Sequence, residues 1–199
     1  GSLDDSDGGK AMRASLSLDW TRALGDGAFQ MNAYAVRSRL DLFSNFTFQL
    51  QHPSDLGDPI NGDQFRQSER RTMTGLNAAR NWDGKLGGAA MTNRLGLQLR
   101  YDRVDPLGLT STVRRDFAAP IRKDDVKEGS AALFAENSVQ WAPWLRSVAG
   151  LRYDHYSFSV DSDNSANSGK VNAHVTSPKL SVILGPWSKT ELFVNYGEG

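Results

Sequence analysis

The stretch from Arg94 to Asp102 reads RLGLQLRYD, and it decides the fold of this chain. Leucine or tyrosine stands at every second position, and the positions between them hold charged residues, glutamine or glycine. A β-strand directs alternate side chains to opposite faces, so this stretch predicts a strand with one apolar and one polar face. A helix would mix the two sets of side chains around its circumference.

The tetrad LRYD at 99–102 returns at 151–154. In the second copy Leu151 and Tyr153 share one face, and Arg152 and Asp154 share the other. The same alternation runs from Met12 to Leu24. Several long strands with one amphipathic plan predict a sheet that has one apolar and one wet side.

Turn-forming residues divide the chain into eight expected strands. Short turns rich in glycine or proline are expected near 25–27, 83–88, 142–144 and 185–188. Long polar connections are expected at 49–67, 105–127 and 161–171. The expected strands are 12–24, 28–48, 68–82, 91–104, 128–141, 145–160, 173–184 and 190–196.

Two of these strands change the phase of their apolar residues. In the second strand Phe29 and Met31 lie on one phase, whereas Tyr34 and Val36 lie on the other, and the sequence therefore predicts a β-bulge between them. The sixth strand changes phase after His155.

Short turns and long loops alternate along the whole chain, as in outer-membrane barrels. The expected strands, roughly 12 to 15 residues long, exceed the usual length of about 5 to 6 and can cross a bilayer at a tilt. All five tryptophans lie close to the short turns, which predicts an aromatic girdle at one membrane interface. These tryptophans are Trp20, Trp82, Trp141, Trp144 and Trp187. The predicted fold class is all-β, an antiparallel transmembrane β-barrel segment of about eight long meander strands.

Composition excludes several classes of function. The 23 basic and 23 acidic residues balance, so no basic surface for nucleic acid is expected. There is no cysteine and no run of apolar residues long enough for a transmembrane helix. No nucleophile elbow, phosphate loop or dinucleotide fingerprint is present, so we expect no enzyme activity, no cofactor and no metal site.

Three groups of short motifs resemble the barrel of TonB-dependent outer-membrane receptors. The first is LDLFSNFTF at 40–48, followed by DP at 58–59 and GDQF at 62–65. The second is LFAEN at 133–137, then WAPWLR at 141–146 and GLRYD at 150–154. The third is SPKL at 177–180, then FVNYGEG at 193–199. Each motif is weak alone, but their order and spacing are specific to this superfamily.

The resemblance implies a barrel of about 22 strands around an N-terminal plug domain, of which residues 1–199 would form a partial barrel domain without the plug or the C-terminal strands. It implies import of a scarce ligand such as a ferric siderophore or another small nutrient. Its implied partners are the outer-membrane lipid bilayer, the plug and an inner-membrane energy-coupling complex. The alternative from the residues themselves is a self-closed eight-stranded outer-membrane barrel with a structural or adhesive role.

Candidate ligand contacts are charged residues on the polar phase of the strands. Arg100 with Asp102, and Arg152 with Asp154, would point into the lumen, where they form either a solvated polar wall or a ligand contact. As exposed pairs they would stabilise the fold by roughly 0 to 1 kcal/mol. The run Glu69, Arg70 and Arg71 sits where the first long loop returns to the sheet and could bind an anionic ligand. Selectivity is expected in the loops 49–67, 105–127 and 161–171, because loops on a rigid scaffold commonly carry recognition.

Overall fold

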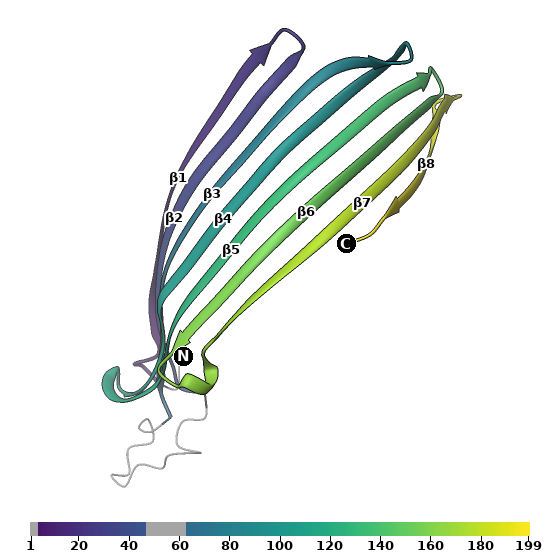
Figure 1. Ribbon diagram of the computed structural model, residues 1–199. Helices are drawn as coiled ribbons and strands as arrows, with labels where there is room; N and C mark the ends of the chain where they lie inside the picture. Colours follow the sequence, from purple (N-terminus) through teal and green to yellow (C-terminus); the bar gives the residue numbers. More distant parts are fainter. Residues whose placement is uncertain (1–3, 47–62) are drawn as a thin grey trace.

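The protein forms one sheet of eight antiparallel strands joined in sequence order, as the computed structural model shows (Figure 1). The structure describes residues 4–46 and 63–199. The sheet is open: β1 and β8 lie at its two edges, and the described strands pair only with their neighbours in sequence. The elements are β1 (Gly8–Leu24), β2 (Gly27–Ser44), β3 (Phe65–Leu86), β4 (Ala89–Val113), β5 (Asp116–Ala142), β6 (Leu145–Ser162), the 3-10 turn η1 (Ser165–Asn167), β7 (Gly169–Trp187) and β8 (Thr190–Gly197). The all-β antiparallel meander predicted from the sequence is confirmed.

The predicted long loop at 105–127 is wrong. These residues continue β4 and β5, which are 25 and 27 residues long, and a two-residue turn at Arg114 and Arg115 joins them. Pro106 and Pro120 signal a loop in the sequence, but the ladder between β4 and β5 shifts register between Val104 and Leu107 and twice more toward the turn. Such irregularities let prolines lie in a strand without breaking it.

The other two predicted loops are also shorter at their described ends. Most of the loop at 49–67 lies outside the described residues, and β3 already begins at Phe65. The connection predicted at 161–171 is shorter in the structure and consists of the residues around η1, because β7 begins at Gly169. We call the end of the sheet that holds these connections the loop end, and the end with the four short turns the turn end (Figure 1).

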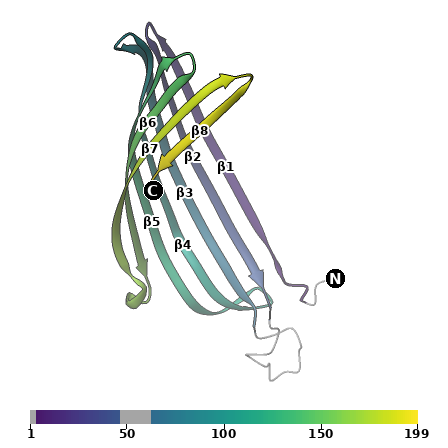
Figure 2. The same cartoon turned by 90° about the vertical axis from the view of Figure 1, so that its right-hand side faces the viewer.

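The sheet has two chemically different faces, which we call the outer and the inner face. The outer face carries the apolar phase: the side chains of Leu133 and Leu151 are each 55% exposed. On the inner face, Ala132 is 4% exposed and Asp154 6% exposed. The twist and curvature of the strands are visible in Figure 2. The inner-face side chains are therefore the ones that pack against one another.

No bulge interrupts β2, so the predicted one is wrong. Its pairing with β1 runs without a shift from Leu24–Gly27 to Gly8–Phe43. Phe29 and Met31 are on the outer face, and Tyr34 and Val36 are on the inner face of the same regular strand. Along β2 the outer face becomes charged toward the loop end, at Arg37, Arg39 and Asp41, and the inner face becomes apolar, at Val36, Leu40 and Leu42. This is expected if the outer face leaves lipid for water at that level.

All five tryptophans lie at the turn end, as predicted. Trp20 and Trp82 are near the turn-end termini of β1 and β3, and Trp141 and Trp187 are at those of β5 and β7. Trp144 stands in the turn between β5 and β6, and its ring centroid is 6.4 Å from that of Trp187. Over residues 4–46 and 63–199, no helix is long and apolar enough to span a membrane.

Candidate functional site

A carboxylate held by two arginines lies on the inner face between β3 and β4. Asp102 is 2% exposed. It accepts hydrogen bonds from Arg71 Nε at 2.9 Å and from Arg100 Nη2 at 3.1 Å. Arg71 and Asp102 come from neighbouring strands, because the β3–β4 ladder pairs Arg71 with Val104 and Met73 with Asp102. This trio ties two strands together and leaves the outer edges of both guanidinium groups in contact with solvent.

The second predicted pair forms a similar cluster on β6. Arg152 donates to both carboxylate oxygens of Asp154 at 2.7 Å, from Nε and Nη2. Its Nη1 donates to Gln98 Oε1, also at 2.7 Å. Gln98 is on β4, and the residue between Gln98 and Asp154 in the register is Ala132 on β5. The small side chain of Ala132 allows this contact to cross an intervening strand.

Beside the Arg152 cluster, toward the turn end, an aromatic ring lines a shallow hollow. The ring of Phe134 lies over Gly96, and the guanidinium carbon of Arg94 is 5.5 Å from the ring centroid. Further along, Glu136 on β5 pairs with Lys179 on β7, across Gly150 on β6. The hollow has a volume of about 470 Å³, and its lining includes Arg94, Gln98, Phe134, Glu136, Arg152 and Lys179.

The structure brings only some of the predicted residues into this inner-face lining. Arg71, Arg100 and Asp102 form one cluster and Arg152 with Asp154 forms the other. Glu69 lines a separate inner-face hollow of about 320 Å³ nearer the loop end. Arg70 points to the face opposite that of Glu69 and Arg71. It lies on the outer face, where it stands opposite Arg39 of β2 in the register. A role for any of these residues in ligand contact stays a prediction.

Sequence reasoning missed Phe134, Glu136 and Lys179 as members of the lining. Arg94 and Gln98 stand on the same phase as Arg100 and Asp102, so the alternation already indicated their face. Phe134 and Lys179 gave no such signal, because their place depends on which residues of β4 and β6 lie opposite them. That register is fixed by pairing across strands, which one strand's sequence does not contain.

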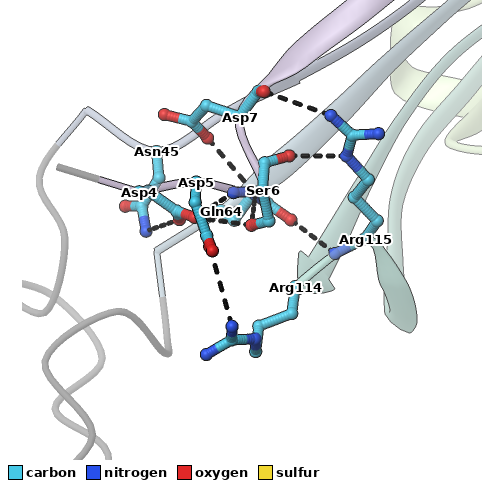
Figure 3. A network of polar contacts seen from close by, with 8 residues as sticks. All are labelled: Asp4, Asp5, Ser6, Asp7, Asn45, Gln64, Arg114 and Arg115. Carbon is cyan, nitrogen blue, oxygen red and sulfur yellow. Dashed lines mark hydrogen bonds and ion pairs between the residues drawn. The ribbon is translucent and has the colours of Figure 1, made fainter. Parts of the chain in front are cut away.

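A second polar network fastens the loop end, and we call it the clasp (Figure 3). Arg115 at the tip of the β4–β5 hairpin donates to the carbonyl oxygens of Ser6 at 2.6 Å and Asp7 at 3.1 Å. Its backbone N–H donates to Gln64 Oε1 at 2.8 Å. Asp4 accepts from Asn45 Nδ2 at 2.9 Å. The clasp therefore joins the hairpin tip to the segment before β1, although β2 and β3 separate these elements in the sheet (Figure 2).

Charge and hydrogen bonding fix the protonation of the clasp. Burial raises the pKa of Asp4, but hydrogen bonds from Ser6 and Asn45 lower it by a larger amount. The pKa of this carboxyl therefore lies below its ordinary value of 3.8. Asp4 is fully buried, and Gln64 is 1% exposed. Both residues of the hairpin turn, Arg114 and Arg115, have left-handed backbone conformations with φ of 49° and 74°. Positive φ at both positions is what a tight two-residue hairpin turn requires, and the turn at Ser188 and Lys189 has the same geometry.

The geometry is that of a wall with an apolar outer face, a charged inner face and tryptophans at one end. A family profile described as "TonB dependent receptor-like, beta-barrel" matches residues 2–199. The chain belongs to the TonB-dependent receptor family. TonB-dependent receptors are barrel transporters of the outer membrane, and this membership accounts for the two-faced sheet.

A solved structure supports the same fold. The "Crystal structure of ferric citrate transporter FecA in the unliganded form" matches with a TM-score of 0.74 and 11% sequence identity. The match covers 95% of this chain and 27% of the transporter chain, so this chain spans about a quarter of that protein's length. No curated protein sequence matches significantly. At this identity the likeness concerns the fold alone.

Proposed function

We propose that this chain is a section of the wall of an outer-membrane receptor that imports a scarce small ligand with energy from an inner-membrane partner. The observation that carries the proposal is the opposite chemistry of the two faces. Between its two ends the outer face offers lipid an apolar surface, whereas the inner face presents paired charges that suit a water-filled or plugged lumen. Family membership adds the expectation of a plug domain and of coupling through TonB.

The inner-face lining would serve as the surface past which ligand and plug move. Its charges are already neutralised by neighbours: Asp102 by two arginines, Arg152 by Asp154, and Lys179 by Glu136. A wall of this kind offers the ligand many weak contacts and no high-affinity site. The ligand can therefore move along the wall without binding tightly. Ferric chelates, including siderophores, and other small nutrients fit such a surface.

The open sheet weighs against the small closed barrel. Closure of eight strands would require β1 to pair with β8, but these strands lie at opposite edges of the described sheet. The inner face also carries long side chains such as Arg71, Arg100 and Arg152, which need more room than the narrow interior of an eight-stranded barrel provides.

Uptake by whole cells tests the proposal. Cells that produce the intact protein would be given a panel of ⁵⁵Fe-labelled ferric chelates and labelled cobalamin, with and without a protonophore. We expect accumulation of at least one probe that stops when the proton gradient collapses. The double variant Arg94→Gln with Lys179→Gln should slow this uptake, whereas Arg22→Gln on the outer face should not. Uptake that is independent of the gradient, or no difference between inner-face and outer-face variants, would contradict the proposal.

A further inference from the structure

A cluster of basic side chains occupies the outer face at the loop end of the first three strands. We call it the outer basic patch. The register places Arg37 beside Ala14, and Arg39 between Met12 and Arg70. In the next rows toward the loop end, Lys10 stands opposite Asp41 in the register, and Arg66 stands opposite Phe43. The patch consists of Lys10, Arg37, Arg39, Arg66 and Arg70.

The patch contains more positive charge than its surroundings neutralise. Asp41 is the one acidic side chain on the outer face of β1–β3 at this end, over the residues that the structure describes. It is shared by Arg39 Nε and Arg66 Nε, each at 3.0 Å. Arg37 and Arg70 have no ion-pair partner within residues 4–46 and 63–199.

Arg39 and Arg70 lie directly opposite each other across β2 and β3. Like charges at directly opposed positions of a sheet destabilise it unless something neutralises them. An anion between the two guanidinium groups would remove the repulsion. Arginine presents a planar fork of donors that matches the oxygen atoms of a phosphate group.

The level of the patch identifies where that phosphate would come from. Arg37 is two residues along β2 from Ala35, which stands opposite Leu16 in a row where the outer face is still apolar. Leu16 is 77% exposed and Met12, inside the patch, is 54% exposed. Apolar side chains directly below a cationic row match the two parts of a lipid, its acyl chains and its charged headgroup.

We propose that the outer basic patch binds the phosphate groups of a lipid in the membrane leaflet at the loop end, an inference that rests on the membrane placement in the proposed function. The acyl chains of this lipid would lie along the apolar outer face of β1 and β2. Its phosphates would bridge Arg39 and Arg70, with Arg37 beside them. A free inorganic anion would have no use for the apolar surface below.

Native mass spectrometry of the intact protein, purified from outer membranes in non-ionic detergent, tests this directly. The probes are diphosphorylated lipid A and the same lipid with its phosphates removed. We expect the phosphorylated lipid to bind and the dephosphorylated lipid to bind far more weakly. The double variant Arg37→Gln with Arg70→Gln should weaken binding about twenty-fivefold, since each basic residue near an anionic surface contributes about fivefold. These two residues form no ion pair with the side chains that the structure describes, so their replacement breaks none.

The matched control removes the same number of positive charges from sites outside the patch. Arg13 lies at the loop end on the inner face, and Arg22 lies on the outer face at the turn end. The variant Arg13→Gln with Arg22→Gln should bind phosphorylated lipid like the original protein. Unchanged binding by the Arg37/Arg70 variant, or equal weakening by the control, would overturn the proposal. Binding of inorganic phosphate as tight as that of the phosphorylated lipid would also overturn it, because the patch would then be a site for free anions.

The outcome is separable from that of the import proposal. Arg37 and Arg70 are on the face opposite the lumen, so their replacement should leave uptake of the labelled probes unchanged. If the original protein binds the phosphorylated lipid but takes up none of the labelled probes, import alone is refuted. Intact uptake without phosphate-dependent lipid binding would refute the lipid site alone.

Discussion

The ring of Phe134 lies so close over Gly96 that a Cβ atom at residue 96 would be 2.2 Å from the Cζ atom of the ring. The two residues face each other across β4 and β5 on the inner face. The guanidinium group of Arg94 covers the same ring. Glycine at 96 is therefore what allows an aromatic ring to lie flat against the wall, with a cation held above it.

Gly96→Val should destabilise the folded protein by about 1 to 3 kcal/mol, because the new side chain must displace the ring. Loss of the heat-modifiable folded band during electrophoresis would measure this. Gly169→Val is the matched control, since a Cβ atom at residue 169 would meet no atom within 4 Å. Adding Phe134→Ala to Gly96→Val should recover part of the loss, and no recovery would show that the ring is not the obstacle.

Asp102→Asn should destabilise the protein by about 1 to 3 kcal/mol, because the amide leaves Arg71 and Arg100 without a shared carboxylate. Urea titration of the folded protein in detergent, followed by tryptophan fluorescence, would measure the change. Asp26→Asn is the control: Asp26 pairs with Arg80 at 3.1 Å, but both side chains are about half exposed. Its loss should cost less than about 1 kcal/mol. If both substitutions lower the free energy of unfolding equally, the burial of Asp102 does not strengthen its ion pairs.

The clasp should loosen in acid. The pKa of Asp4 is held below 3.8 in the folded protein, so its contribution to stability is complete above that value and is lost as the pH falls through the lower folded pKa. The backbone amide of Thr112 donates to the backbone oxygen of Gln64 at 2.8 Å, as part of the clasp. Hydrogen exchange at the amides of Thr112 and Arg115, corrected for intrinsic rates, should accelerate at low pH relative to other strand amides. In Asp4→Asn the same amides should exchange quickly at pH 5 already. Exchange independent of pH in the original protein would contradict this account.

The tryptophans should all lie at one membrane interface. In proteoliposomes, lipids brominated near the headgroup should quench their fluorescence more strongly than lipids brominated near the end of the acyl chain. The stacked pair Trp144 and Trp187 should contribute together, so replacing either with phenylalanine should reduce quenching by headgroup bromine. Stronger quenching from the bilayer centre would contradict the girdle.

A polypeptide limited to residues 1–199 should not insert stably into detergent micelles as a monomer. The described sheet is open at β1 and β8, and unpaired backbone groups in lipid cost several kcal/mol each. Reversible, heat-modifiable folding of this segment alone would contradict the expectation. The intact protein purified from outer membranes is the positive control.

The alternation of apolar and polar residues was sufficient to predict the strands, their order and the turn end. Residues 94–102 and 151–154 follow this pattern without exception, because one face of the sheet is apolar and the other is charged. The pattern failed in the middle of β2. There the outer face carries the small residues Ala33 and Ala35, and the ring of Tyr34 points inward over Gly75, so the sequence signal looked like a bulge.

The candidate site was harder to predict for a different reason. Arg100, Asp102, Arg152 and Asp154 were placed on the inner face correctly by phase alone. Arg70 was grouped with Glu69 and Arg71 because they are adjacent in sequence, although adjacent strand residues point to opposite faces. The hairpin at 105–127 was missed because prolines and charges resemble a loop, and only pairing with another strand shows otherwise.

The clasp has a consequence for cleavage by proteases. Arg114 and Arg115 form a dibasic bond of the kind that trypsin cuts, and they stand at the tip of a long hairpin. Trypsin needs a flexible, extended substrate, but Arg115 is fixed by Ser6, Asp7 and Gln64. An intact hairpin after digestion would report a closed loop end, and a nick at this bond would report that the segment before β1 has come away.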